Sequence, residues 1–272
     1  MHEKAYAAQC AAEDKRCATI PHRRSGKLPL FALALGSFAI GTSEFASMGI
    51  LRLFSADLHL GLSSATNAIA AYAAGVVIGA PTITLAAARM NRRRLLLGLM
   101  GLFVVGNLLS SLAMNLGMLA AARFVSGLPQ GAYFGAGAVV ASYVVGPGRS
   151  GKAFSLVMTG LTVATIVGSP LATFLGQTTG WRVTYVIVAG VGAAALLALL
   201  VFVPRTRDLS GSSLVKEIGA LRKPAVWTIM GVAALGVASI FAVYSFIGPT
   251  SPMRPASTSA SYRSLSPSSV SA

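Results

Sequence analysis

Acidic residues and histidines are scarce in this chain, which holds seven Asp and Glu residues and three His among 272 residues. Only one acid, Glu44, lies inside a long apolar run. No set of Cys, His and acidic residues has the spacing of a metal site, and no Ser–His–acid set can be drawn. A glycine-rich phosphate loop followed by Lys and Ser or Thr is also missing. We therefore expect no enzyme, no ATP-driven pump, no metal and no cofactor.

Cysteine is nearly absent as well, since Cys10 and Cys17 are the only two. Their spacing fits no zinc motif, and thiols stay reduced in the cytoplasm. Both lie in the polar segment 1–27, which has no apolar period. We interpret this segment as a disordered cytoplasmic extension without a functional thiol.

Charged residues make up only 11% of the chain, whereas apolar residues make up 54% and the mean hydropathy is +0.71. Soluble domains carry about 25% charged residues, so this chain lacks the polar surface of a soluble fold. The net charge of +15 would otherwise favour a nucleic-acid partner. Because the basic residues stand between apolar runs, we expect a lipid bilayer as the partner and no nucleic acid.

Seven apolar runs reach the length of about 20 residues that a helix needs to span a bilayer. Each run must be helical, because the hydrocarbon offers no water to the backbone. The first run is too long for a cleaved signal peptide. The sequence predicts an all-α membrane protein with spans at about Leu28–Leu51, Ser64–Ala87, Leu95–Ala113, Leu119–Tyr143, Phe154–Gln177, Val183–Val203 and Ala225–Ile247.

Lysine and arginine are distributed unevenly along the chain. Seventeen lie before the first span or in the connections after the second, fourth and sixth spans, whereas the other connections hold only Arg52 and Arg182. Basic residues accumulate on the cytoplasmic side of a membrane. The bias predicts a multi-pass inner-membrane protein with a cytoplasmic N-terminus.

The polar connection 204–224 divides the membrane region into two unequal parts. We expect a six-helix bundle at 28–203, a central cytoplasmic loop at 204–224 and a seventh helix at 225–248. This layout is typical of transporters that are built from two six-helix halves.

The segment 249–272 is a low-complexity stretch rich in Ser and Pro. One interpretation is a disordered tail. The other, which we favour, is a shifted reading frame near Pro249–Ser251, because a shifted frame can encode apolar residues there. The shifted fit is not decisive, since the TC codons of serine always give an apolar residue when shifted in this direction.

Small residues recur at every fourth position in three of the spans, and such stripes let helix backbones approach closely. A proline in each of these spans, Pro81, Pro129 and Pro170, removes one backbone hydrogen bond and permits a bend. Two interpretations stay open: ordinary bundle packing, and helices that slide during a transport cycle. The stripes are Ala71, Gly75 and Gly79; Gly127, Gly131 and Gly135; and Gly160, Ala164, Gly168, Ala172 and Gly176.

Two charged residues inside the spans are candidates for function. The charged form of a carboxylate is costly at membrane depth, which makes Glu44 a candidate for proton coupling or cation recognition. The alternative for Glu44 is an acid near the outer end of its span, solvated or paired. Arg123 could partner an acid or relay charge, or it could extend to the membrane interface.

Uncharged polar residues in the spans are weaker candidates for lining a central cavity. Gln130 is the strongest, because it follows Pro129, where the helical hydrogen bonds are already disturbed. For each residue the alternative is a hydrogen bond between helices without a ligand. The other candidates are Ser43, Asn67, Tyr72, Asn107 and Tyr133.

Three segments resemble the major facilitator superfamily of transporters. Ala70–Arg94 resembles its second helix and first cytoplasmic loop, Leu119–Gly131 (LAAARFVSGLPQG) its helix-4 motif, and Gly160–Trp181 its helix-5 antiporter motif. Together they resemble the drug:proton antiporter branch with twelve helices, of the chloramphenicol-resistance and arabinose-efflux type. The expected fold is then the N-terminal six-helix bundle of that superfamily plus one helix of an incomplete second half.

The resemblance implies secondary active efflux of small drug-like or sugar-like molecules by proton antiport through alternating access, impaired by truncation. It makes Arg123 the motif arginine of helix 4. The alternative is a non-transporting membrane fragment that acts at most as a scaffold; substrate identity and oligomeric state stay open. The antiporter motif is represented by Gly160, Gly168, Pro170 and Gly176, and the cytoplasmic-loop motif by Arg89, Arg92 and Arg93.

The cytoplasmic-loop motif departs from the family pattern, which has a glycine, an aspartate and another glycine around its basic cluster. This chain has Thr84, Ala88 and Asn91 at those places. A conformational latch that depends on the aspartate is therefore not expected. The arginines can still serve topology and anionic headgroups.

The frameshift hypothesis is tested by resequencing the encoding DNA from the codon of Ala225 to well beyond that of Ala272. We expect another frame to run on into about five further apolar spans. A confirmed stop followed only by polar or non-coding sequence would contradict the hypothesis.

Overall fold

The computed structural model describes residues 27–146, 148–204, 224, 227–229, 231–232 and 234–239. All regular elements assigned within these ranges are helices, which confirms the predicted all-α fold. The chain forms two units, Met1–Arg222 and Lys223–Ala272. Apart from boundary residues, the predicted N-terminal extension, central loop and tail lie outside the described residues. The seventh predicted span is represented by a short apolar helix, Trp227–Ser239.

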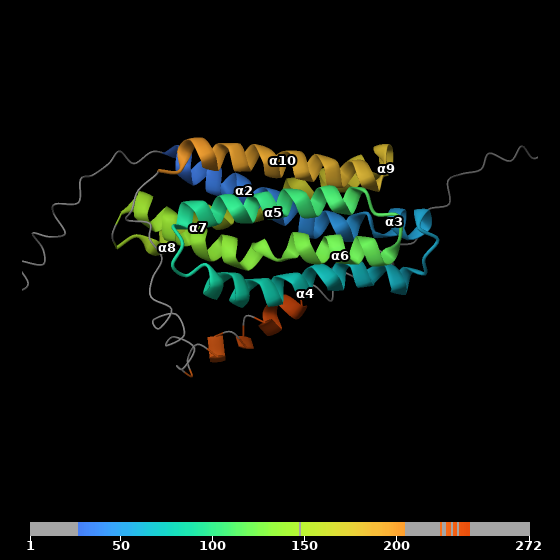
Figure 1. Ribbon diagram of the computed structural model, residues 1–272, viewed down its shortest axis with the longest axis horizontal. Helices are drawn as coiled ribbons and strands as arrows, with labels where there is room; N and C mark the ends of the chain where they lie inside the picture. The colour runs from blue at the N-terminus through green and yellow to red at the C-terminus, as the bar shows by residue number, and fades with distance from the viewer. Residues whose placement is uncertain are drawn as a thin grey trace, which may run out of the picture. The chain divides into compact units, whose positions relative to one another are not determined.

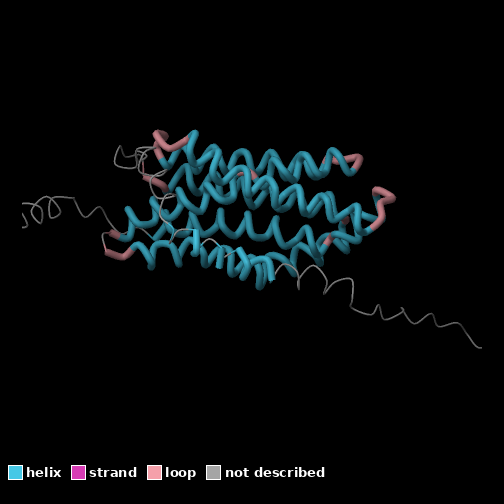
Figure 2. The backbone as a smooth tube through the Cα atoms, turned by 90° about the horizontal axis from the view of Figure 1, so that it is seen from below, coloured by secondary structure: helices cyan, strands magenta, loops and turns pink. Residues whose placement is uncertain are grey.

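The first unit is a bundle of long helices that lie side by side, with short connections at its two ends (Figures 1 and 2). Helix α2, for example, has 23 residues, which at 1.5 Å per residue gives about 35 Å, enough to cross a bilayer core. The elements are α2 (Lys27–Gly49), α3 (Leu51–Asp57), α4 (Leu62–Ala86), α5 (Arg92–Ser111), α6 (Leu116–Gly127), α7 (Pro129–Val145), α8 (Ser150–Val163), η1 (Ala164–Gly168), α9 (Ser169–Thr179) and α10 (Trp181–Phe202).

The described helices correspond to five of the six predicted spans of the bundle as continuous segments. Five segments are long and apolar enough to cross a membrane: α2, α4, α5, the continuous stretch Ser150–Thr179, and α10. The fourth predicted span is divided into α6 and α7, which meet at Leu128. The backbone of Leu128 keeps helical angles, φ −48° and ψ −43°. Pro129 follows it without a backbone N–H to donate, so the helix is interrupted where a bend was expected.

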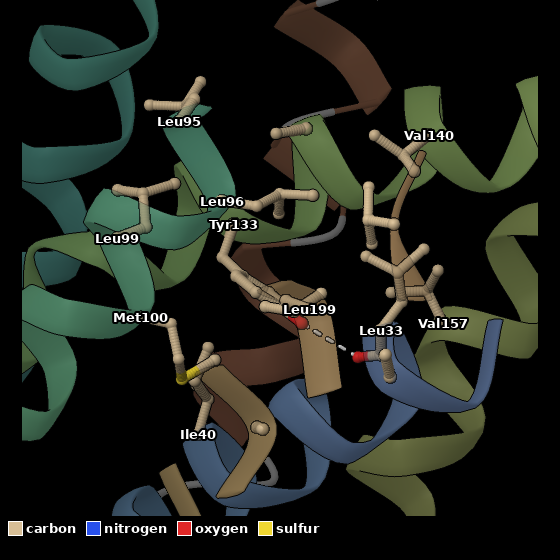
Figure 3. Packing of buried hydrophobic residues seen from close by; sticks show 14 of the residues in the cluster. Leu33, Ile40, Leu95, Leu96, Leu99, Met100, Tyr133, Val140, Val157 and Leu199 are labelled. Atoms are coloured by element: carbon tan, nitrogen blue, oxygen red, sulfur yellow. Dashed lines mark hydrogen bonds between the residues drawn. The ribbon is translucent and has the colours of Figure 1, made fainter. Parts of the chain in front are cut away.

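The main hydrophobic core lies between α2, α5, α7, α8 and α10 (Figure 3). Tyr133 of α7 is fully buried in it, and its hydroxyl donates a hydrogen bond of 3.0 Å to the backbone carbonyl of Leu33. The phenol of Tyr133 fits here because residue 36 is a glycine. A Cβ at Gly36 would overlap the Tyr133 hydroxyl. Other members of this core are Ile40, Leu95, Leu96, Leu99, Met100, Val140, Val157 and Leu199.

Glycines bring α4 against α6 and α7, which lie beside it in Figure 1. A Cβ at Gly75 would overlap the carbonyl oxygen of Phe124, and one at Gly79 would overlap that of Leu128. From the other side, a Cβ at Gly127 would overlap the carbonyl oxygen of Tyr72. The helices therefore approach to backbone contact, as expected of small-residue stripes in membranes.

The stripe of the fifth span packs on α2 in the same way. Its members Gly160, Ala164, Gly168, Ala172 and Gly176 are all buried. A Cβ at Gly160 would overlap the carbonyl oxygen of Ala34, and one at Gly168 the hydroxyl of Thr42. Pro170 is exposed and follows η1, a π-helical turn; such turns disturb the regular hydrogen bonds of a helix. The stripe thus forms a helix contact, and its sliding remains a prediction.

The close approach of α4 can be tested with one methyl group. Gly79→Ala places that group against the Leu128 backbone and should destabilise the bundle by about 1–3 kcal/mol, because the core is already full there. The measurement is the apparent melting temperature of the purified chain in detergent, followed by circular dichroism. Gly135→Ala is the matched control, since a Cβ at Gly135 meets nothing within 4 Å. Equal melting temperatures for the two variants would contradict this packing.

Candidate functional site

Polar side chains from three helices meet at Ser43, in the C-terminal half of α2. The Ser43 hydroxyl donates to Oδ1 of Asn107 on α5 at 2.8 Å. It also accepts a hydrogen bond of 2.9 Å from Nη1 of Arg123 on α6, whose Nη2 lies 3.3 Å from the Ser43 carbonyl oxygen. Asn107 in turn donates to the carbonyl of Phe103 at 2.9 Å. All three side chains are buried, so the bonds fix the register of α2, α5 and α6.

The guanidinium of Arg123 lies close to two aromatic rings. Its central carbon is 4.2 Å from the ring centroid of Tyr72 on α4 and 5.4 Å from that of Tyr185 on α10. Arg123 is 1% exposed, so it does not extend to the membrane interface. The rings and the two bonds to Ser43 offset part of the cost of burying the charge.

Among the described residues, no carboxylate oxygen lies within 4.0 Å of the Arg123 guanidinium, so Arg123 forms no ion pair there. The ion pair that is found in this part of the chain joins Arg182 and Asp57. Its Nε is buried and has no hydrogen-bond partner among them either. A guanidinium has five N–H donors, and two nitrogens of this one are engaged, both with Ser43. The hydrogen-bond and ring partners of this buried cation are thus all neutral groups.

Glu44 ends a second hydrogen-bonded chain next to this cluster. Nε2 of Gln130, at the start of α7, donates to Oε2 of Glu44 at 3.0 Å. Oε1 of the same amide accepts a hydrogen bond of 2.6 Å from the Tyr72 hydroxyl. Glu44 and Gln130 are half-buried, whereas Tyr72 is buried. The chain therefore leads from a partly accessible carboxyl group to the ring on which Arg123 rests.

Two members of the cluster, Ser47 and Tyr185, were not among the sequence candidates. The Ser47 hydroxyl donates to the Ser43 carbonyl at 2.8 Å and lies 3.2 Å from the Tyr185 hydroxyl. The position of Ser47, four residues after Ser43, would have placed it on the same helix face. Tyr185 follows Trp181 at the start of a strongly apolar helix and carries no comparable signal.

The remaining cavity candidates lie elsewhere. Asn67 is exposed near the start of α4, and Tyr133 belongs to the hydrophobic core. The structure therefore brings together Ser43, Glu44, Tyr72, Asn107, Arg123 and Gln130 and leaves these two apart. No group of three His, Cys, Asp or Glu side chains that could hold a metal ion occurs within the described ranges.

The arginines of the predicted cytoplasmic-loop motif lie at the start of α5 or just before it and are not hydrogen-bonded to this cluster in the described part of the chain. Arg89 is exposed, whereas Arg92 and Arg93 are buried. Nη2 of Arg93 donates to the carbonyl of Leu200, in the last turn of α10. Its backbone N–H donates to the side chain of Asn91, which caps α5. A cation beside the final carbonyls of a helix is favourable, so Arg93 joins the start of α5 to the end of α10.

At the end of the bundle opposite to Arg92–Arg94, an ion pair joins the end of α3 to the start of α10. Nη1 of Arg182 and Nε1 of Trp181 both donate to Oδ2 of Asp57, the latter at 3.1 Å. Nη2 of Arg182 also donates to the carbonyl of Ala113 at 3.1 Å, and its guanidinium stacks on Trp181. The hydrogen bond from Arg182, and secondly that from Trp181, lowers the pKa of Asp57 from its usual value of 3.8.

The sequence matches the family model of the Major Facilitator Superfamily over residues 33–264. The chain belongs to the Major Facilitator Superfamily. It is a multi-pass membrane protein of a transporter family rather than an enzyme, as the sequence predicted.

The curated relatives of this chain include transport proteins and a drug-resistance protein. It is 38% identical over 223 residues to the putative transporter AraJ of Escherichia coli K12, covering 82% of this chain and 57% of AraJ. It is 38% identical over 221 residues to the inner membrane transport protein YdhP of the same strain, covering 81% and 57%. It is 31% identical over 226 residues to the chloramphenicol resistance protein of Streptomyces lividans, covering 82% and 58%. The chain thus spans a little over half the length of these curated relatives.

Solved structures show the same fold. A peptide transporter POT, crystallised in complex with sulfate, superposes with a TM-score of 0.62 at 17% identity. The match covers 86% of this chain and 50% of that one. Because the identity is low, this likeness shows only the arrangement of the helices. That arrangement agrees with the Major Facilitator fold, which the sequence predicted.

The Asp57 ion pair carries a prediction about pH. Because the folded chain lowers the pKa of Asp57, the bond stabilises the fold above the pKa of the unfolded chain and loses its effect as the pH falls through the folded-state value. Between about pH 5 and pH 2, the apparent melting temperature of the native chain should therefore fall more than that of Asp57→Asn. Arg182→Gln should behave like Asp57→Asn. The same acid sensitivity in all three proteins would contradict the assignment.

Proposed function

We propose that this chain forms the N-terminal bundle of a secondary active transporter that exports small drug-like or sugar-like molecules by proton antiport. The observation that carries the proposal is the hydrogen-bonded chain Glu44–Gln130–Tyr72 beside the buried Arg123. A half-buried carboxyl group next to a buried cation is a natural place to take up and release a proton within a membrane.

Glu44 is the proton-coupling residue in this proposal. It is the single acid of the predicted spans, and its hydrogen-bond donor is a neutral amide rather than a cation. A proton can therefore be added to Glu44 without breaking an ion pair. Arg123 supplies a fixed positive charge nearby, and Gln130 lies between the carboxyl group and the buried tyrosine.

Efflux is supported by the names of the relatives. The Streptomyces lividans relative is a chloramphenicol resistance protein, and AraJ is a putative transporter. A membrane protein that confers resistance to a drug can do so by exporting it. Chloramphenicol is therefore the first substrate to test, although the proposal extends to other small molecules.

Alternating access in this fold needs a second bundle that rocks against the first around a shared site. Two of the membrane-spanning segments, α4 and Ser150–Thr179, are the least buried. Only 22% and 28% of the residues in their most apolar stretch are buried within the bundle. The corresponding share for α2 and α5 is 50%. The exposed faces of these two segments are where we place the second bundle, supplied by further chain or by another protein.

We also propose the bacterial inner membrane as the location, with the N-terminus and the Arg92–Arg94 end of the bundle in the cytoplasm. The uneven distribution of Lys and Arg supports this orientation. The relative YdhP is an inner membrane transport protein.

Because alternating access needs a second bundle, the test uses everted membrane vesicles in which the 272-residue chain is co-expressed with the portion of AraJ that this chain does not match. Chloramphenicol is added to these vesicles under an imposed pH gradient. We expect chloramphenicol to release protons from the vesicles, and Glu44→Gln to lower that rate by about tenfold or more, since the amide cannot carry the proton. Asp57→Asn is the matched control because it makes the same chemical change outside the cluster.

Two results would contradict the proposal. Unchanged proton release in Glu44→Gln would remove Glu44 from the coupling step. Normal membrane insertion without any chloramphenicol-dependent flux would favour the alternative, a non-transporting membrane fragment that acts at most as a scaffold.

A further inference from the structure

The side chain of Gln130 is bonded at both of its ends, and the two bonds have opposite directions. Its amide nitrogen donates to Glu44, and its amide oxygen accepts from the Tyr72 hydroxyl. An amide offers donors at one end and an acceptor at the other, so the direction of this chain is set by the groups that Gln130 joins.

The described arrangement suits an ionised Glu44. A carboxylate can only accept hydrogen bonds, so it requires the N–H end of the amide. The amide oxygen is then left to Tyr72, whose hydroxyl serves as the donor at 2.6 Å. Every link of the chain has one donor and one acceptor.

A protonated Glu44 changes the requirement at one end. Its new O–H is a donor, and the amide oxygen of Gln130 is the acceptor already present in the chain. If the amide turns over, the Glu44 O–H donates to the amide oxygen, and the amide nitrogen donates to the Tyr72 oxygen. The Tyr72 hydroxyl then changes from donor to acceptor towards Gln130, and its proton must find another acceptor. A buried donor without a partner costs about 1–3 kcal/mol. The hydrogen bonding of the Tyr72 hydroxyl must therefore change when Glu44 is protonated and the amide turns over.

We propose that Gln130 is a positioning residue whose amide turns over when Glu44 gains a proton, and that this reversal transmits the protonation of Glu44 to Tyr72. The inference rests on the proposed role of Glu44 in proton coupling. Because the Arg123 guanidinium stacks on the Tyr72 ring, the reversal reaches the polar cluster without a hydrogen bond or ion pair between Arg123 and Glu44, neither of which occurs among the described residues. In this step the two hydrogen bonds of the Gln130 amide reverse their direction, and the proton added to Glu44 stays on Glu44.

The position of Gln130 favours a role in switching. It is the first residue after Pro129, at the break between α6 and α7. Glycine contacts at Gly79 and Gly127 hold the backbone of this break against α4. The backbone is thus fixed by close packing while the side chain spans from α7 to both α2 and α4.

Other charged and titratable groups surround α2, and Arg123 is the cation among them that acts on Glu44 electrostatically. The neighbouring helices α8, η1 and α9 contribute no titratable side chain between Lys152 and Arg182. On the other elements these groups are Arg52 and Asp57 on α3, Tyr72 on α4, Arg92, Arg93 and Arg94 on α5, Tyr133 and Tyr143 on α7, and Arg182 and Tyr185 on α10.

The relay is tested by infrared difference spectroscopy of the purified full chain in lipid nanodiscs between about pH 5 and pH 9. The carboxylic-acid band of Glu44 is identified by its loss in Glu44→Gln, and an isotope-labelled tyrosine band of Tyr72 by its loss in Tyr72→Phe. In the native chain both bands should change with the same pH midpoint. In Gln130→Leu the Glu44 band should still titrate, while the Tyr72 change falls about fivefold or more because its link to the carboxyl group is gone.

Gln177→Leu is the matched control, since it makes the same change at an exposed position of α9, and it should behave like the native chain. If Gln130→Leu does not fold, the labelled amide band of Gln130 in the native chain replaces it and should shift at the Glu44 midpoint. A Tyr72 band that ignores Glu44 in the native chain, or follows it equally in Gln130→Leu, would overturn the relay alone. A Glu44 band that does not titrate in this range would overturn both the relay and the proposed proton coupling.

Discussion

The buried guanidinium of Arg123 is the constraint on which the rest of this bundle depends. A charge within a membrane protein is costly unless dipoles or counter-charges surround it. Here Ser43 accepts two hydrogen bonds from it, and the rings of Tyr72 and Tyr185 face it. These partners come from α2, α4 and α10, so one side chain of α6 fixes three neighbours at a common depth. Asn107 adds α5 through its bond from Ser43.

The close packing of the helix backbones makes this arrangement possible. Glycines along α4, α6 and α7 remove the side chains that would hold these helices apart. Tyr72 can then place its ring under Arg123 and its hydroxyl on Gln130 at the same time. The same tyrosine therefore belongs to the cationic cluster and to the chain that ends at Glu44. The cation and the acid are linked through it without forming an ion pair.

Much of this could be predicted from the sequence, because it depends on length and composition. The apolar runs gave the spans of the bundle, and Pro129 indicated the break between α6 and α7. Polar residues are so costly in a span that Glu44, Arg123 and Gln130 stood out individually. The distribution of such residues along the chain was enough to identify most of the cluster.

The rotation of each helix about its axis could not be predicted in the same way. A helix that is apolar on all sides carries little periodic signal for its inward face. Asn67 was therefore expected to line a cavity, and Gly135 to belong to a helix-contact stripe, although both are exposed. Tyr133 was expected near a cavity but points into the core beside Gly36, and Tyr185 was missed because its partner Ser47 lies 138 residues away.

The most direct test of this account asks what holds Arg123 in place. Double-mutant cycles on the thermal stability of the chain in detergent would pair Arg123→Met with Ser43→Ala, and separately with Glu44→Gln. The account predicts a coupling of about 1–3 kcal/mol between Arg123 and Ser43 and a smaller one between Arg123 and Glu44. A larger coupling to Glu44 would contradict it, because it would make the carboxylate the principal partner of the buried cation.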